Sequence, residues 1–302
     1  MPTDRNADTN AASGAGNDAG NHSKNQEQID YWNGKAGQTW VRSMDRIDRM
    51  LVPITKALLE RAAVAPGERV VDVGCGCGST TLELVQRGAL VFGIDVSEPM
   101  LALAKRRASG LKGVGFRRAD AATQPFTPDH ELVFSRFGVM FFVDPVAAFR
   151  NLCSGITPGG RLCFVCWQNA SANAWMSTAG QAVESFLPKP TTPPDPRAPG
   201  PFAFAERGYL RSVLEQAGFA SIEIEDLRTT LHLGDDLDQA MAFQTDIGPV
   251  ARALAELEGE LRTQALAAAR EALAKHLTPA GIDLGAACWL VTARLPPQAS
   301  GS

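Results

Sequence analysis

The chain has 302 residues, of which 45% are hydrophobic and 21% are charged, so it is long enough to bury a full core. Its formal net charge is −4 at pH 7, whereas nucleic-acid binders usually carry a basic stripe that neutralises phosphates. We therefore expect no nucleic-acid partner. The sequence has no apolar run of about 18 residues and no signal-peptide pattern, which predicts no membrane span and a cytoplasmic location.

The six cysteines do not predict a metal site. Cys163 and Cys166 have the spacing of a CxxC pair, but both fall in a predicted strand, where residues three apart point to opposite faces. Cys75 and Cys77 lie in a glycine loop, where a metal would block the backbone that a ligand needs. We expect all six to be small buried hydrophobic side chains in a reducing compartment.

The N-terminal part changes character near residue 29. Residues 1–28 have almost no large apolar side chains and are rich in Asn, Asp, Ala, Gly and Ser, a composition that predicts a flexible tail. Aromatic residues then precede a stretch with apolar side chains at helical spacing, Arg46–Ala63, which Pro66-Gly67 ends. Residues 29–65 are therefore predicted to form a helical segment ahead of the next domain.

Residues 66–167 alternate between predicted strands and helices. The strands are predicted at Arg69–Val73, Ala89–Ile94, Val114–Arg118, Leu132–Phe137 and Arg161–Trp167. The helices are predicted at Thr80–Arg87, Glu98–Ala108 and Pro145–Gly155. Such alternation is typical of βαβ units with a parallel sheet covered on both faces, so the predicted fold class is a doubly wound α/β domain.

The pattern becomes mainly helical after Trp167. Residues 168–205 contain a predicted helix, Ala174–Phe186, and a connector at 188–201 in which half of the residues are proline. This region is predicted to be an insert that caps the sheet.

Residues 206–302 return to the sheet. A helix is predicted at Glu206–Ala217, followed by strands at Ser221–Leu231 and Ala286–Arg294. Between these strands, Asp236–His276 is Ala- and Leu-rich and predicts two helices, which would form a second cap insert.

The most specific segment is a short strand that runs into a glycine loop, Asp72-Val73-Gly74-Cys75-Gly76-Cys77-Gly78. Glycines let the backbone turn tightly and touch a ligand at the carboxyl end of the first strand. About 20 residues later, Asp95 ends the second strand, where a carboxylate can accept both hydroxyls of a ribose. Together these features predict a nucleoside site.

Two classes of nucleoside ligand suit such a loop. A dinucleotide fingerprint reads G-x-G-x-x-G and holds a pyrophosphate at a helix N-terminus. Here the third glycine comes one residue early, and the charge of Asp72 opposes a pyrophosphate but suits an ammonium group. An adenosyl amino acid is therefore favoured over NAD, and an NAD(P)-dependent reductase is the less favoured alternative.

The glycine loop and Asp95 resemble motifs of the class I S-adenosylmethionine-dependent methyltransferases, and further matches follow in that family's order. Arg118-Ala119-Asp120-Ala121 resembles the segment after the third strand, Glu131–Phe137 the fourth strand, and Pro158–Arg161 the turn into the fifth. The resemblance covers Ile29 to about Trp167 and is strongest to the ubiquinone- and menaquinone-type small-molecule methyltransferases, although the usual residue at Cys77 there is Thr or Ser.

This resemblance implies a mostly parallel, seven-stranded Rossmann-like sheet with a helical cap, with residues 29–65 as a lid. It also implies S-adenosylmethionine as the methyl donor, S-adenosylhomocysteine as the product, and no metal. It assigns cofactor binding to residues of the lid, the glycine loop and the strand ends: Tyr31, Trp40, Asp72, Gly74, Cys75, Gly76, Asp95, Val96, Met100, Asp120, Ala121 and Ser135. A substrate pocket is expected among the nearby aromatic and apolar residues: Trp32, Phe137, Met140, Trp167 and Trp175.

Catalytic residues are less clearly predicted. Methyl transfer from a sulfonium is an in-line displacement that depends mainly on alignment, and a base is needed only if the nucleophile loses a proton. His232, at the end of a predicted strand near the cap, is the best candidate base. Arg136 could hold an acidic substrate group or pair with a structural carboxylate.

The cap segments are apolar and lack a basic face, which points to a small, largely apolar or aromatic methyl acceptor. The expected protein is thus an S-adenosylmethionine-dependent methyltransferase of small molecules, a monomer or a homodimer. A non-catalytic S-adenosylmethionine-binding or regulatory protein is the alternative that the sequence leaves open.

Overall fold

The structure is a computed structural model that describes residues 24–188, 191, 193 and 195–296. Most of the predicted tail, residues 1–23, lies outside the described residues. Residues 24–33 are helical, so the predicted start of structure at residue 29 is wrong. This helix docks partly through polar contacts, such as Asn25 Nδ2 to Asp120 Oδ2 at 2.8 Å, and such contacts leave no apolar periodicity in the sequence.

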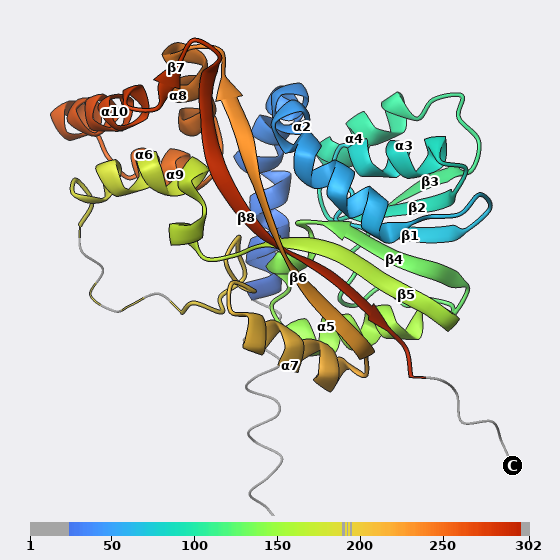
Figure 1. The fold of residues 1–302 in the computed structure, drawn as a ribbon. Helices are drawn as coiled ribbons and strands as arrows, with labels where there is room; N and C mark the ends of the chain where they lie inside the picture. Colours follow the sequence, from blue (N-terminus) through green and yellow to red (C-terminus); the bar gives the residue numbers. More distant parts are fainter. Residues whose placement is uncertain (1–23, 189–190, 192, 194, 297–302) are drawn as a thin grey trace, which may run out of the picture.

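A single mixed sheet forms the core, and it comprises eight strands within the described part of the chain. The strands are β1 Arg69–Val73, β2 Leu90–Asp95, β3 Val114–Arg118, β4 His130–Arg136, β5 Ile156–Trp167, β6 Ala220–Gly234, β7 Leu277–Thr278 and β8 Gly281–Arg294. Their order is β3-β2-β1-β4-β5-β8-β6, with β7 paired to β8 beside this path (Figure 1). The short β7 makes one strand more than predicted, because two residues are too few to show a period.

The direction of the strands confirms the predicted doubly wound, mostly parallel α/β class. β1 to β5 run parallel to one another, whereas β8 runs antiparallel to both β5 and β6. In β1, every residue except Arg69 is buried, as expected for a strand covered on both faces.

Helices cover both faces of the sheet (Figure 1). One face carries α2 Lys35–Ala62, α3 Ser79–Gln86 and α4 Glu98–Arg107, and the other carries α5 Pro145–Ser154 and α7 Arg207–Ala217. Two short 3-10 turns, η1 Val139–Phe141 and η2 Ala170–Ala172, follow β4 and β5. The five predicted core helices therefore form within a residue or two of the predicted bounds, except for the start of α2.

Helix α2 begins at Lys35, well before the predicted start at Arg46. Its second half buries Ile47, Leu51 and Ile54 at helical spacing, which is the pattern that the sequence shows. Its first turns instead bury the small Gly37, where a Cβ atom would lie only 2.1 Å from the carbonyl oxygen of Trp32. A close backbone approach of this kind gives no hydrophobic signal.

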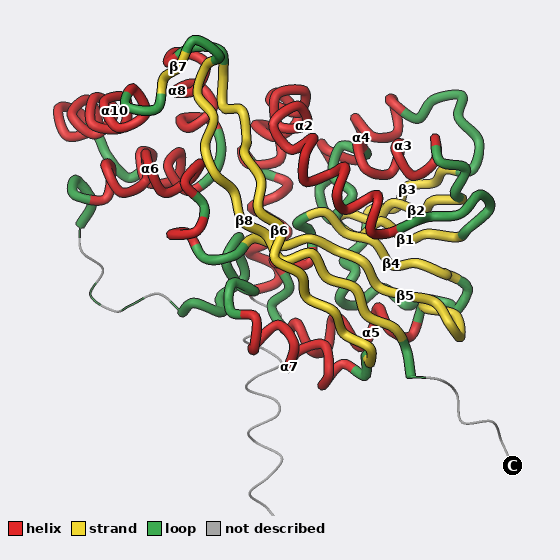
Figure 2. Tube along the Cα trace, viewed as in Figure 1, coloured by secondary structure: helices red, strands yellow, loops and turns green. Residues whose placement is uncertain are grey.

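The cap is built on the far ends of β6 and β8, which extend beyond the rest of the sheet (Figure 2). Its helices are α6 Ala174–Glu184, α8 Leu237–Asp246, α9 Pro249–Ala255 and α10 Gly259–Ala274. The prediction of two helices over Asp236–His276 is wrong, because this described segment has three. Gly248 and Gly259 adopt positive φ angles of 90° and 55° and interrupt the helical run.

Across the described ranges, no helix is both long and apolar enough to cross a membrane.

Candidate active site

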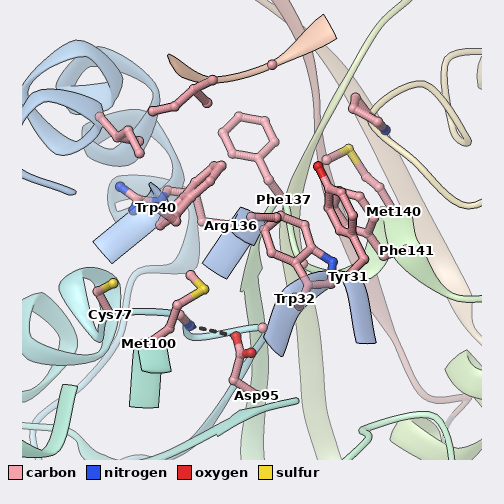
Figure 3. A pocket seen from close by; sticks show the side chains of 18 of the residues that line it. Tyr31, Trp32, Trp40, Cys77, Asp95, Met100, Arg136, Phe137, Met140 and Phe141 are labelled. Carbon is pink, nitrogen blue, oxygen red and sulfur yellow. Dashed lines mark hydrogen bonds between the residues drawn. The ribbon is translucent and has the colours of Figure 1, made fainter. Parts of the chain in front are cut away.

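A cavity of about 420 Å³ lies where the carboxyl ends of β1, β2, β4 and β5 meet the N-terminal helices and the cap. This is the expected place for a ligand in a doubly wound sheet, and the volume is within the roughly 300–1,000 Å³ of small-molecule sites. Of the predicted site residues, all but Asp72, Ser135 and His232 line it. In Figure 3, aromatic side chains extend across the cavity above Asp95: Trp40, Phe137, Trp32, Tyr31 and Phe141.

The glycine loop forms the floor of the cavity. Gly74 and Gly76 have φ angles of 68° and 54°, in the left-handed region that favours glycine. A Cβ atom at Gly74 would lie 2.7 Å from Gly138 Cα, and one at Gly76 would lie 2.7 Å from Met100 Cε. The bare backbone is therefore required both for the turn and for the close packing of β1 against the end of β4.

Asp95 ties the glycine loop to the start of α4. Its Oδ2 accepts from the Gly76 amide at 2.8 Å and its Oδ1 from the Ser97 amide at 2.8 Å. Burial raises the pKa of Asp95, while these amide donors act in the opposite direction. Each oxygen keeps a free lone pair, so the carboxylate can still accept two hydroxyls from a ligand in the cavity.

Asp120 lies in the segment after β3 and is bonded to the N-terminal helix. Its Oδ2 accepts from Asn25 Nδ2 at 2.8 Å, and its Oδ1 accepts from the Ala122 amide at 2.9 Å. Asn25 lines the cavity as well. Sequence reasoning missed Asn25 because it fell in the predicted tail.

The predicted contact of Asp72 with a ligand needs correction. Asp72 is fully buried beneath the loop and does not line the cavity. Its Oδ2 accepts from the hydroxyls of Thr80 and Thr81 at 2.8 and 2.6 Å, at the N-terminus of α3, where a negative charge is favoured. Burial raises the pKa of Asp72 to about 6. This side chain therefore positions the loop and α3 rather than touching a ligand.

Ser135 is corrected for a similar reason. It is fully buried, and its Oγ donates to the Val73 carbonyl at 2.8 Å and accepts from the Gly138 amide at 3.2 Å. The hydroxyl joins the carboxyl ends of β4 and β1, so it is used up inside the sheet and does not reach the cavity.

His232 lies away from the cavity, which corrects its prediction as a base. Its ring nitrogens face Asp283 Oδ1 at 2.8 Å and Asp235 Oδ1 at 3.2 Å, at the tip of the β6–β8 pair. The hydrogen bond with Asp283 is the main cause of a raised pKa of His232. The prediction that His232 lies near the cap is correct. However, β6 extends to Gly234, and His232 lies near the end of this strand, outside the cavity.

Arg136 lines the cavity and also pairs with a carboxylate, so both roles considered from the sequence remain open to it. Its Nη2 donates to Asp48 Oδ1 at 2.9 Å and its Nη1 to Thr55 Oγ1 at 2.8 Å. The Ser79 hydroxyl donates to the other oxygen of Asp48. These bonds join α2, the start of α3 and the end of β4 at the cavity wall.

Asp48 was missed, although the sequence carries a signal for it. Asp48 and Thr55 are seven residues apart on α2, so they share one face, next to the buried Ile47 and Ile54. A polar pair beside an apolar stripe on a helix indicates a partner across the interface, here Arg136.

The opposite side of the cavity is aromatic. Phe137 stacks on Trp167 with a centroid distance of 4.3 Å and an interplanar angle of 11°, and Trp167 lies 5.0 Å from Trp175. Trp32 packs edge-on against Phe141 at 5.1 Å. Phe137 has a φ angle of 66°, an uncommon value for a non-glycine residue, which turns the chain sharply after β4 and keeps the ring in the stack.

Metal and thiol chemistry find no support in the described residues. No group of three or more His, Cys, Asp or Glu side chains there is arranged to hold a metal ion. Burial raises the pKa of the Cys77 thiol to about 12 and that of Cys75 as well, so both are neutral thiols near neutral pH. Five of the six cysteines are buried as expected, whereas Cys153 is only half-buried, so the expectation is wrong for that residue.

Comparison with known proteins shows which proteins this chain is similar to in sequence and fold. Residues 70–160 match the family model described as a methyltransferase domain. The chain is 30% identical over 185 residues to a demethylmenaquinone methyltransferase of Clavibacter sepedonicus, an alignment that covers 57% of this chain and 76% of that protein. A solved putative methyltransferase from an antibiotic biosynthesis pathway of Anabaena variabilis has the same fold, with a TM-score of 0.56 at 15% identity, over 81% of this chain and 97% of that one.

Other relatives are matched over a smaller part. Phosphoethanolamine N-methyltransferase 1 of Zea mays is 34% identical over 112 residues, which are 36% of this chain and only 22% of that protein. The chain thus spans less than a quarter of that relative's length.

The fold is that of an S-adenosylmethionine-dependent enzyme. This class is defined by the glycine loop, by the two aspartates at the strand ends and by the match to the methyltransferase domain. The chain belongs to the class I S-adenosylmethionine-dependent methyltransferases.

Proposed function

We propose that the protein transfers the methyl group of S-adenosylmethionine to a small, largely apolar or aromatic acceptor. The observation that carries the proposal is that one cavity contains both the Gly74–Cys77 loop with Asp95 and the Phe137–Trp167–Trp175 aromatic cluster. The first suits an adenosyl group, and the second suits a flat apolar molecule by stacking.

The residues present fit the adenosyl half of the cofactor. Asp95 and Asp120 both line the cavity and retain acceptor capacity, in keeping with contacts to the ribose hydroxyls and the adenine amino group. The side chains of Val96, Met100 and Ala121 add apolar walls between them. When bound, S-adenosylmethionine supplies an activated methyl group on a sulfonium.

We assign the amino-acid end of the cofactor to the Asp48–Arg136 pair. The pair lines the cavity beside Cys77 and Ser79, where the glycine loop leads into α3. An ammonium and a carboxylate carried on one carbon complement a carboxylate and a guanidinium held together at 2.9 Å. Arg136 uses only two of its N–H groups on Asp48 and Thr55, which leaves donors for a ligand carboxylate.

Transfer in this cavity depends on alignment and exclusion of water. Alignment alone supplies roughly 7–11 kcal/mol in favourable cases. The described residues that line the cavity include no histidine, and the Asp48–Arg136 pair is assigned to the amino-acid end of the cofactor. The proposed contribution of the chain is therefore to hold the cofactor through this pair and to stack the acceptor on the aromatic cluster.

Calorimetric titration with two ligands tests this assignment. S-adenosylhomocysteine carries the amino-acid end, whereas methylthioadenosine lacks it. We expect Asp48→Asn to weaken S-adenosylhomocysteine about tenfold, the loss of a charge-assisted contact, while methylthioadenosine binding stays within about twofold.

Asp95→Asn is the matched control, and it is expected to weaken both ligands. Failure of the unmodified protein to bind S-adenosylhomocysteine would refute the proposed function itself. Equal weakening of both ligands by Asp48→Asn would instead remove the pair from the amino-acid end and leave the function standing.

A further inference from the structure

A second cavity, of about 370 Å³, lies along the same helix as the first but has a different chemistry. Three arginines of α2 line it, Arg42, Arg46 and Arg49, together with Asp45 of the same helix and Asp246 at the end of α8. We call it the arginine pocket. In a chain with a net charge of −4, three guanidinium groups against two carboxylates make a local concentration of positive charge.

The three arginines stand on one face of α2 because they are four and three residues apart. Arg46 is paired with Asp246, with Nη2 to Oδ2 at 2.7 Å. Arg42 donates only to the hydroxyl of Thr39 at 2.9 Å. Within the described ranges, neither Arg42 nor Arg49 forms an ion pair, so both guanidinium groups are open to an anion.

The two cavities adjoin each other. Thr39 and Asp246 line both of them. Trp175 lies 5.0 Å from Trp167 at the first cavity. The buried Phe243 lies 6.1 Å from Trp175 and 5.6 Å from the guanidinium of Arg46, and it lines neither cavity. A molecule with its apolar body at Trp175 would therefore reach the arginines past Thr39 and Asp246, which line both cavities.

We propose that the arginine pocket binds the anionic oxygen group, a carboxylate or a phosphate, of the methyl acceptor, whose flat apolar part lies against Trp167 and Trp175. The inference rests on the proposed function and narrows its substrate class. Planar guanidinium groups bind both anions through paired N–H bonds. The apolar first cavity accommodates the flat part of the acceptor, and the adjoining arginine pocket accommodates its anionic group.

Matched probes test the proposal on the full chain loaded with S-adenosylhomocysteine. Naphthoate and naphthamide share a ring system and differ in charge, and naphthyl phosphate adds the second anion. We expect calorimetry to show naphthoate or naphthyl phosphate binding about tenfold tighter than naphthamide, and this preference to fall with rising salt. The double variant Arg42→Gln, Arg49→Gln is expected to lose the preference and to keep its affinity for naphthamide and S-adenosylhomocysteine.

The double variant Lys105→Gln, Arg106→Gln is the charge-matched control, since both residues are exposed on α4 and line neither cavity. Equal affinity of the unmodified protein for the charged and uncharged probes, or no binding of any probe, overturns the proposal. So does a preference that survives in the double variant. Inorganic phosphate binding as tightly as naphthyl phosphate would show a site for a free anion instead. If the unmodified protein does not bind S-adenosylhomocysteine, this result would refute the proposed function rather than this inference.

Discussion

The polar residues around the glycine loop are of two kinds: some face the cavity, and others hold the loop and the strand ends in place. Asp95 and Asp120 face it, whereas the buried Asp72 fixes the threonines at the start of α3 and Ser135 joins β4 to β1. A buried carboxylate with two hydroxyl donors is costly to disturb. The glycine loop is therefore held from beneath by buried side chains that do not line the cavity.

Gly76 gives a sharp test at the residue scale. We expect Gly76→Val to abolish S-adenosylhomocysteine binding, because its positive φ of 54° disfavours a β-branched side chain and its Cβ would lie 2.7 Å from Met100 Cε. Calorimetry measures the binding, and circular dichroism reports whether the fold persists.

Gly110 offers the matched control for backbone strain. It too has a positive φ, of 82°, but a Cβ there would have no neighbour within 4 Å, and it does not line the cavity. Gly110→Val should cost stability and leave binding intact. Retained binding in Gly76→Val would mean that the loop is not the cofactor site.

Among the elements, α2 and the β6–β8 pair organise the two ends of the molecule. Helix α2 presents Asp48 to the first cavity and its arginines to the second. The β6–β8 pair carries the cap, and its tip is held by His232 between Asp283 and Asp235. The tip does not line the first cavity, and it leads directly into the start of α8.

The His232 cluster predicts a pH dependence of stability. Its hydrogen bond with Asp283 raises the pKa of His232 above the ordinary value of 6.5. The protonated ring therefore stabilises the fold fully below about pH 6.5, and this contribution is lost as the pH rises through the raised pKa. Because the side chain is 45% exposed, we expect less than about 1 kcal/mol.

Urea unfolding at several pH values measures this contribution. The free energy of unfolding of the unmodified protein should exceed that of His232→Gln at about pH 5.5 and converge with it near pH 9. Asp283→Asn should remove the same pH-dependent difference. A constant gap between the curves would show that His232 acts through packing and not through its charge.

At the scale of the whole molecule, the sequence predicted the core elements, helix α6 of the cap and the position of the second cap insert, but not the number of helices in that insert. Strands β1 and β3 form at the predicted bounds because buried parallel strands and glycine turns leave local signals. The three-helix cap insert and the long β6–β8 pair depend on contacts between distant segments. The contacts of Asp48 with Arg136 and of Asn25 with Asp120 were missed for the same reason. These partners are 88 and 95 positions apart in the chain, and only the fold brings them together.

The same contrast explains His232. The sequence predicted the strand that bears His232, but this strand extends to Gly234, and His232 lies near its end, outside the cavity. Placing a side chain on the right element is not enough to make it a base, because reach to the reacting atoms decides the role.

The central claim is that this protein moves a methyl group, and the most direct measurement follows that group. The protein is incubated with S-adenosylmethionine labelled on its methyl group and with a low-molecular-weight metabolite fraction, and S-adenosylhomocysteine and labelled products are separated. We predict that S-adenosylhomocysteine accumulates together with a labelled small molecule, and that Gly76→Val produces neither. Tight binding of S-adenosylmethionine with no transfer to any component would contradict the account and indicate a non-catalytic binding protein.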